Sequence, residues 1–204
     1  MPKDKSETHK RIMEAAKHEF TEYGYNDASL RRIASNAGIQ VSGLYKHFAS
    51  KKEMFSSLVD PTVEGFYRLY REIEDAYFSE IETVDPGYEW ENENETVRGI
   101  NYIYNHLDEF KLLLLKSNGT EYEDFAHEVA CLEENVTMRF MEQLKQKGVP
   151  VKPVDPLELH MLASVYVESV FQIVEHNLTK EKAMHYADTL QKFYTAAWKA
   201  LFGI

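Results

Sequence analysis

The chain has 204 residues, 44% of them hydrophobic and 28% charged, and its formal net charge is −11. This is the composition of a soluble globular protein with one large domain or two small ones. The longest apolar run, Leu112–Leu115, is too short for a transmembrane helix, and the charged N-terminal stretch lacks the apolar segment of a signal peptide. The single Cys131 cannot form an internal disulfide, so we expect a cytoplasmic protein without a membrane partner.

The charge is distributed unevenly along the chain. Residues 1–66 carry ten Lys and Arg against nine Asp and Glu, a net +1, so the remaining residues carry −12. An acidic protein is not an obvious partner for nucleic acid, but here the acidity lies outside the first segment. We therefore expect modest non-specific affinity for DNA and strong dependence on correct positioning of the cations.

The first predicted helix runs from about Ser6 to Tyr23 and ends at Gly24. Its apolar residues recur at helical spacing and form one stripe: Ile12, Ala15, Ala16, Phe20 and Tyr23. Such a stripe predicts that the helix packs across the next two helices and completes a three-helix core.

Two short helical patterns meet at a glycine between Ser29 and Phe48. The first has Ser29 as a potential N-cap, and its apolar residues fall at i, i+3, i+4 and i+7: Leu30, Ile33, Ala34 and Ala37. Gly38 can end this helix in the left-handed conformation. After a three-residue turn, a second helix is predicted from Val41 to about His47. Helix, glycine turn and helix together indicate a helix-turn-helix.

The outward face of the second helix carries small or polar side chains that could approach base edges and phosphates. Gly43 would let the backbone come close to DNA. Four cations flank the helix and suit a phosphate backbone: Arg31, Arg32, Lys51 and Lys52. Periodicity alone leaves an ordinary helical hairpin with a solvated charged face as the alternative.

A longer pattern of residues favours the DNA-binding interpretation. The stretch Ile33-Ala34-x-x-Ala37-Gly38-Ile39, then Leu44-Tyr45-x-His47-Phe48-x-x-Lys51-x-x-Met54, resembles the DNA-binding domain of the TetR family of bacterial transcriptional regulators. The resemblance reaches back through Ile12-x-x-Ala15-Ala16-x-x-x-Phe20-x-x-x-Gly24-Tyr25.

This resemblance implies DNA contacts from both short helices. The implied DNA-binding residues are Ser29, Arg31, Gln40, Val41, Ser42, Gly43, Tyr45, Lys46, His47 and Lys51. In chain order, the first two would contact phosphate, the next four would form the groove-facing start of the recognition helix, and the next three its phosphate-contacting end. The last resembles the lysine that opens the following helix.

Three positions depart from the family pattern. The family usually has Ser or Thr where Gln40 stands, glycine where Ser42 stands, and a side chain where Gly43 stands. Glutamine is a poorer cap than serine or threonine. These departures affect which bases are preferred rather than the class of protein.

A long helix is predicted to start after Ser50, with Asp60-Pro61 interrupting its pattern. Because proline removes a backbone donor, Pro61 either kinks the helix or opens a separate one. The following stretch, 80–95, has seven carboxylates around Asp85-Pro86-Gly87, and it predicts a solvated loop without the spacing of a calcium-binding loop.

From Val97 the pattern is helical to the C-terminus, with helices predicted around 100–107, 108–117, 122–147 and 157–176 and a last one from about Thr179. The helix over 157–176 is apolar on nearly every side, so it should be buried all round. We expect the last two helices to pair with their symmetry mates in a homodimer, which would hold two recognition helices against a palindrome.

The predicted fold is therefore all-α. Residues 1–66 form a TetR-type helix-turn-helix domain with a three-helix core, and residues 67–204 form a helical domain for ligand binding and dimerisation. Aromatic residues, methionines and one histidine are candidates for a pocket in the second domain. These candidates are Tyr102, His106, Phe110, Tyr122, Phe125, Met138, Met161 and Tyr166.

No catalytic motif is present, and Cys131 lies between apolar positions of a helix, as a small buried hydrophobe would. The histidines lack metal-ligand spacing, so no enzyme activity, cofactor or metal is expected. The resemblance implies a sequence-specific transcriptional regulator, a ligand-responsive repressor of a palindromic operator with an unidentified small-molecule effector. The alternative is a helical small-molecule-binding or interaction protein that kept the fold and lost specific DNA binding; an all-helical enzyme is a more distant third.

Overall fold

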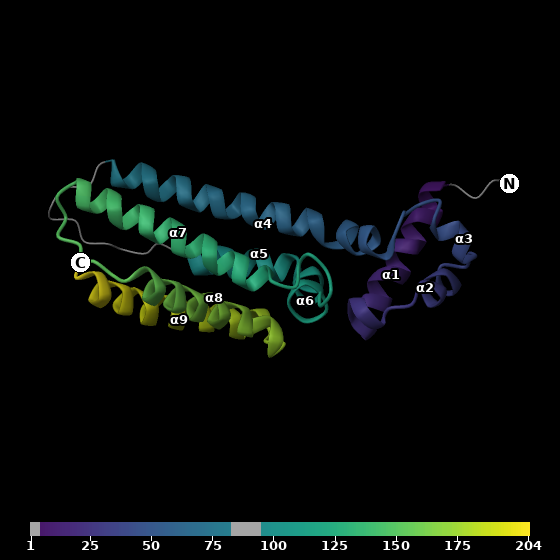
Figure 1. The fold of residues 1–204 in the computed structure, drawn as a ribbon. Coiled ribbons are helices and arrows are strands. Elements are labelled where there is room, and N and C mark those ends of the chain that lie inside the picture. The colour runs from purple at the N-terminus through teal and green to yellow at the C-terminus, as the bar shows by residue number, and fades with distance from the viewer. Residues whose placement is uncertain (1–4, 83–94) are drawn as a thin grey trace. The chain divides into compact units, whose positions relative to one another are not determined.

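The computed structural model of the protein describes residues 5–82 and 95–204, and within these ranges every regular element is a helix (Figure 1). The helices are α1 (Lys5–Asp27), α2 (Leu30–Asn36), α3 (Val41–Leu44), α4 (Lys51–Ile81), α5 (Glu95–Asn105), α6 (Leu107–Leu115), α7 (Phe125–Gln146), α8 (Pro156–Glu175) and α9 (Lys180–Phe202). The all-α class predicted from the sequence is confirmed.

The chain divides into two compact units. The first contains Met1–Glu64 together with His106–Glu123, and the second contains Gly65–Asn105 and Asp124–Ile204. The sequence predicted one boundary after residue 66, with everything beyond it in the second domain. The observed first unit instead includes α6 and the turn that follows it.

The core of the first unit lies between α1, α2, α3 and the start of α4. Ile12, Phe20, Ile33 and Phe55 are completely buried, and the rings of Phe20 and Phe55 meet edge to face at 5.1 Å. Such aromatic pairs add stability beyond the apolar area they bury. α1 changes direction at Gly24, whose φ of 72° confirms the predicted helix stop.

The segment after α5 packs onto α1 within this same unit. The Lys17 ammonium lies 2.9 Å from the carboxylates of both Asp108 and Glu109 on α6, and the Tyr25 N–H donates to the Lys116 carbonyl at 2.8 Å. Phe110 of α6 is completely buried. These contacts join residues about ninety positions apart in sequence, which local patterns cannot reveal.

α4 continues through Pro61, so the alternative of a separate helix beginning there is wrong. Pro61 is exposed, and the loss of one backbone donor is tolerated inside a 31-residue helix whose flanking turns are packed. Asp60, immediately before it, accepts a hydrogen bond from the Tyr122 hydroxyl.

In the second unit, α4 and α7 run parallel, because their paired residues advance together along both helices. Tyr67 donates to Glu128 at 3.1 Å, and the Lys147 ammonium donates to the Glu82 carbonyl at 3.0 Å. α8 and α9 lie on the other side of α7 (Figure 1). Residues 83–94, most of the predicted acidic loop, lie outside the described residues, and Glu95 already begins α5.

α8 is not buried all round in the single chain, contrary to the expectation from its sequence. Leu157, Met161 and Val165 are 66%, 54% and 58% exposed. By length and composition alone α8 could also cross a membrane, which is weak support because core helices of other proteins meet the same test. Its exposed side is instead the kind of surface that a second polypeptide covers.

Candidate nucleic-acid interface and ligand cavity

The helix-turn-helix forms where the local signals place it. Ser29 has extended dihedral angles, and its hydroxyl accepts a hydrogen bond from the Arg32 N–H at 3.5 Å, as expected of an N-cap. Gly38 has a φ of 67° and makes the turn in the left-handed region. Leu44 packs inward and is buried, so the opposite side of α3 remains at the surface.

The recognition helix is shorter than predicted. α3 ends at Leu44, and the chain to His47 continues as a turn in which the His47 N–H donates to the Leu44 carbonyl at 2.8 Å. Two causes are visible: Gly43 is a poor helix former, and Gln40 makes no side-chain hydrogen bond at the N-cap. Tyr45, Lys46 and His47 are therefore presented by a turn.

The implied DNA contacts differ in exposure. Five are exposed: Arg31, Gln40, Ser42, Tyr45 and Lys46. The other five are partly buried: Ser29, Val41, Gly43, His47 and Lys51. A Cβ added at position 43 would lie 3.6 Å from the Ile39 Cδ1, an ordinary contact, so that side of Gly43 faces the turn between α2 and α3.

Arg32 is exposed but bound to other groups of the protein, although the sequence suggested it as a phosphate-binding cation. Its Nε donates to the Glu19 Oε1 at 2.7 Å, its Nη2 donates to the Asp27 carbonyl at 2.9 Å, and its guanidinium lies 4.1 Å from the Tyr23 ring centroid. Glu19 is 1% exposed and also accepts from the Ser29 N–H at 2.8 Å. This carboxylate therefore ties α1 to the first turn of α2.

Lys51 also has an internal role that its resemblance to a DNA-contacting lysine does not imply. Its ammonium donates to the carbonyls of Tyr25, Asn26 and Ala28 at 2.7, 3.1 and 3.2 Å. Burial lowers the pKa of Lys51. Three carbonyl acceptors can use all three ammonium hydrogens, so Lys51 stabilises the fold, and its contact with DNA stays a prediction.

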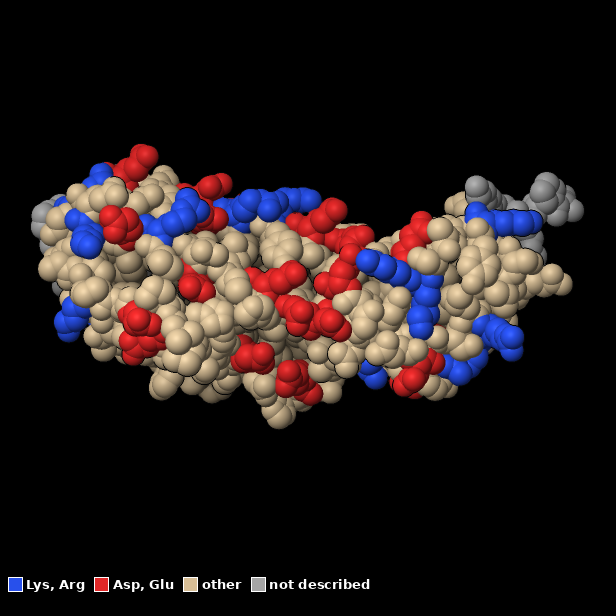
Figure 2. Space-filling view, in the orientation of Figure 1, with Lys and Arg blue, Asp and Glu red and all other residues tan. Residues whose placement is uncertain are grey.

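The remaining cations near α3 are few. Lys52 is paired with Glu121 at 3.0 Å, whereas the exposed Arg31 and Lys46 have no ion-pair partner in the described part of the chain. On the face in Figure 2, acidic side chains crowd the helices of the second unit, and Lys and Arg are the more frequent charges around α1–α3. The charge asymmetry seen in the sequence thus reaches the surface.

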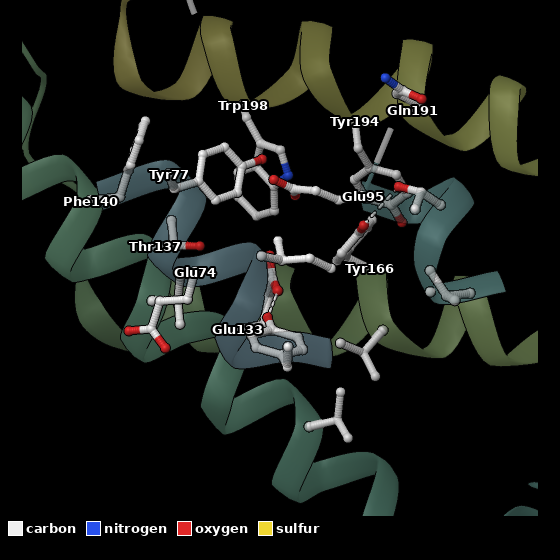
Figure 3. A pocket seen from close by; sticks show the side chains of 18 of the residues that line it. Glu74, Tyr77, Glu95, Glu133, Thr137, Phe140, Tyr166, Gln191, Tyr194 and Trp198 are labelled. Carbon is white, nitrogen blue, oxygen red and sulfur yellow. Dashed lines mark hydrogen bonds between the residues drawn. The ribbon is translucent and has the colours of Figure 1, made fainter. Parts of the chain in front are cut away.

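The second unit contains a cavity of about 130 Å³ between α4, α5, α7, α8 and α9. Its wall is mainly aromatic and aliphatic, with a few polar groups, as in many small-molecule sites. The labelled side chains of Glu95, Glu133 and Tyr166 come from three different helices and line this space (Figure 3). The Tyr166 hydroxyl lies 3.1 Å from the Thr96 Oγ1, and the Tyr70 hydroxyl donates to the Glu133 carboxylate.

Burial disfavours the charged form of both carboxyl groups. It raises the pKa of Glu133 to about 7 and that of Glu95 to about 8, the latter against the opposing field of Arg98. Burial, followed by the field of Glu133, also raises the pKa of Tyr166. Each of these three groups is thus more readily neutral than the same group in water.

The comparisons with known proteins agree with this arrangement. The family described as "Bacterial regulatory proteins, tetR family" matches residues 12–58. An HTH-type transcriptional regulator of Staphylococcus aureus (strain USA300) is 25% identical over 186 residues, 83% of this chain and 98% of that regulator. Residues 12–58 thus resemble the tetR family of bacterial regulatory proteins, and most of the chain resembles a transcriptional regulator. TetR-family regulators bind DNA, respond to small molecules, act as dimers and are regulators of transcription rather than enzymes.

Two solved TetR-like structures share the fold of this chain. FadR from Bacillus subtilis, in complex with stearoyl-CoA, has a TM-score of 0.56 and 14% identity over 90% of this chain and 95% of that chain. NalD, the secondary repressor of the MexAB-OprM multidrug efflux pump in Pseudomonas aeruginosa, has a TM-score of 0.56 and 17% identity, covering 92% and 96%.

The predicted pocket residues correspond poorly to the observed cavity, of which Tyr166 forms part of the wall. His106, Phe110 and Tyr122 belong to the first unit. The others lie in the second unit: Phe125 is buried in an aromatic cluster, Tyr102 packs on Phe66, and Met138 and Met161 are 43% and 54% exposed. Hydrophobicity alone could not separate core, surface and cavity positions.

The cavity residue with the clearest missed signal is Glu133. It stands four residues after Val129 and three before Val136, on the apolar stripe of α7. A carboxylate on an otherwise apolar helix face indicates either a buried polar partner or a site. The sequence predicts Glu95 in a solvated loop, but this residue begins α5 and lines the cavity.

The contacts of Cys131 and of two histidines do not form a metal site or a catalytic group. Cys131 is partly exposed rather than fully buried, and its Sγ lies 3.6 Å from the His127 Nε2. His160 pairs with Glu134 at 2.9 Å. Across residues 5–82 and 95–204, no group of three or more His, Cys, Asp or Glu side chains is arranged to hold a metal ion.

The raised pKa of Glu133 leads to a prediction about stability. A carboxyl group with a raised pKa in the folded state weakens folding as pH rises from its ordinary value near 4.5 to about 7, because the unfolded chain releases the proton more easily. Glu133→Gln should therefore stabilise the unliganded protein at pH 8 by about 1–3 kcal/mol, with the difference shrinking toward zero by pH 4. Thermal unfolding across this range measures the effect.

The control for this prediction is Glu142→Gln, an exposed carboxylate on the same helix. It should change stability by less than about 0.5 kcal/mol at every pH. A Glu133→Gln difference that is independent of pH would contradict the assigned titration.

Proposed function

We propose that this chain is a TetR-family, ligand-responsive repressor that binds a palindromic operator as a homodimer in the cytoplasm. The observation that carries the proposal is the pairing, in one chain, of an exposed helix-turn-helix face with a mainly apolar cavity in the other unit. The helix-turn-helix face could bind DNA and the cavity could bind a ligand, and the two lie in different units. This separation fits a protein in which ligand binding changes DNA affinity.

On the DNA side, we assign base reading to the start of α3 and phosphate contact to its flanks. Gln40 and Ser42 are exposed polar side chains suited to base edges. Arg31, Tyr45 and Lys46 are exposed on either side and suit phosphate oxygens. Ser29, Val41, Gly43 and His47 would shape this surface from partly buried positions.

The homodimer is proposed to form through α8 and α9. Exposed apolar side chains on α8 are Leu157, Met161, Leu162 and Val165. On α9, the exposed residues Phe193, Ala196, Ala197 and Ala200 fall at i, i+3, i+4 and i+7, which is one helix face. Two such faces, repeated by a two-fold axis, would bury apolar surface that water otherwise contacts.

Ligand binding is proposed to affect the DNA-binding unit through α4 and α5. α5 contributes Glu95 and Ile103 to the cavity wall and leads directly into α6, which is packed on α1. α4 likewise carries cavity residues and, at its start, Lys51. The effector would shift DNA affinity by binding one arrangement of these helices more tightly than another.

The test is selection of bound duplexes from a random DNA pool at two salt concentrations. We expect enrichment of a palindrome whose half-sites lie one helical turn, about 34–36 Å, or a multiple of it apart. Binding without a motif that vanishes at the higher salt would contradict the proposal. It would favour the other candidate, a small-molecule-binding protein that kept the fold.

A further inference from the structure

The ionisable groups of acidic or basic residues in the described cavity wall are all carboxyl groups. Three carboxyl groups, those of Glu74, Glu95 and Glu133, line it, and none of the described lining residues is Lys, Arg or His. Residues 83–94, which lie outside the described part, contain no basic residue in their sequence either. A cavity with buried carboxyl groups and no cation is electrostatically incomplete.

The three carboxyl groups are not equivalent. Glu74 is paired with Arg139, whose guanidinium also lies 4.5 Å from the Phe78 ring centroid, so its charge is balanced. Glu133 accepts a hydrogen bond from Tyr70 and has no basic partner among the described residues. Near Glu95 the only basic group that contributes is Arg98, which itself pairs with Glu72 at 3.6 Å.

Aromatic rings surround these two carboxyl groups. Tyr70, Tyr77, Tyr166, Tyr194 and Trp198 all line the same space, and the rings of Tyr166 and Tyr194 meet edge to face at 4.8 Å. Ring faces attract cations, most strongly where water is excluded. The carboxyl groups and the rings therefore favour the same kind of ligand.

We propose that the cavity binds a lipophilic organic cation, an amine or quaternary ammonium on an apolar group, with Glu133 and Glu95 as its counter-charges. This proposal rests on the proposed function, in which the cavity is the effector site. A bound cation would supply the positive charge that the buried carboxylates lack. A fatty acid or a phosphate-bearing ligand would bring a further negative charge against them.

The size of the cavity limits the part of the ligand that it can enclose. A volume of about 130 Å³ is close to that of an engineered protein cavity of about 150 Å³ that binds benzene. We therefore take phenyltrimethylammonium as the probe, tert-butylbenzene as its uncharged equivalent and decanoate as the anionic comparison. Calorimetric titration of the 204-residue protein with each compound gives the affinities.

We expect phenyltrimethylammonium to bind at least about tenfold more tightly than tert-butylbenzene. Glu133→Gln should remove most of this preference without weakening tert-butylbenzene binding, because the side-chain shape is retained. Glu142→Gln, exposed on the same helix, should leave all three affinities unchanged. Equal binding of the cation and its uncharged equivalent, a preference unaffected by Glu133→Gln, or tighter binding of decanoate would overturn the proposal.

Cation affinity should also rise from pH 6 to pH 8, because the cation competes with the protons of the two carboxyl groups. The other titratable groups that line the cavity with Glu133 are Tyr70, Glu74, Tyr77, Glu95, Tyr166 and Tyr194. Glu74 is paired with Arg139, and burial raises the pKa of Tyr166, so Glu133 and Glu95 are the groups expected to respond. An affinity that does not change with pH would count against Glu133 and Glu95 as counter-charges.

The same compounds separate this inference from the proposed function. If the cation binds as expected but leaves affinity for the selected operator unchanged, the ligand class stands and ligand-responsive repression fails. If decanoate, but not the cation, binds and changes operator affinity, repression stands and the ligand class is wrong.

Discussion

Replacing Arg32 by alanine should destabilise the DNA-binding unit, because among the described residues the buried Glu19 carboxylate then keeps the Ser29 N–H as its remaining hydrogen-bond donor. The loss should be smaller than for a fully buried ion pair, since the Arg32 side chain is 46% exposed and water can partly replace it. Urea unfolding at pH 7 and one fixed protein concentration measures the loss.

The destabilisation caused by Arg32→Ala should decrease as the pH falls below the ordinary carboxyl pKa. Burial opposes ionisation of Glu19, but the hydrogen bonds from Arg32 and Ser29 outweigh it and lower its pKa. A lowered carboxyl pKa contributes stability above the ordinary value near 4.5, and that stability is lost as pH falls further. The difference between Arg32→Ala and the unmodified protein should therefore shrink in acid, and adding Glu19→Gln should recover part of it.

The neighbouring Arg31 is the matched control. It is exposed and has no internal acceptor in the described part of the chain, so Arg31→Ala should change stability by less than about 0.5 kcal/mol. It should instead weaken binding to all DNA sequences and reduce the salt slope by about 1. If Arg31→Ala unfolds the unit, or if Arg32→Ala affects only DNA binding, the two roles are assigned the wrong way round.

The second large effect is expected from Val165→Asp on the exposed side of α8. Val165 is 58% exposed, so the change should be tolerated by the single chain. In the proposed dimer it would place two unpaired carboxylates in an apolar interface. Sedimentation at micromolar concentration should show a monomer, and operator affinity should fall by more than about 100-fold because the two half-sites are no longer bound together.

Leu115→Asp provides the comparison for this variant. Leu115 is 44% exposed and lies on α6, which belongs to the first unit rather than to the second unit with α8 and α9. It should remain dimeric. A Val165→Asp protein that stays dimeric with full operator affinity would show that another surface joins the two subunits.

The parts of the fold that the sequence predicts well are those set by local chemistry. The cap at Ser29, the positive φ at Gly38 and the apolar spacing of α1 and α2 each depend on residues a few positions apart. These local signals predicted the helix-turn-helix, and the structure confirms it. The extent of α3 was overestimated because helix propensity near Gly43 is weak and the turn up to Phe48 retains some helical character.

The roles that depend on distant partners were not predictable in this way. The sequence predicts Arg32 and Lys51 to be surface cations. Only the folded chain shows that Arg32 pairs with Glu19 and that Lys51 donates to three carbonyl groups. The cavity depends on five helices at once, so apolar spacing could not separate its wall from the core. Its most informative residue, Glu133, conflicts with the pattern of its own helix, and such conflicts are expected at functional sites.

The contacts between α6 and α1 limit where this chain can be truncated or joined to a relative. Because the first unit is built from two separate segments, truncation after residue 64 would leave Lys17 and the backbone of Tyr25 without their partners. A chimera that exchanges DNA specificity between relatives must therefore carry 106–123 together with the N-terminal segment. During synthesis, likewise, the recognition unit cannot be completed until residue 123 has left the ribosome.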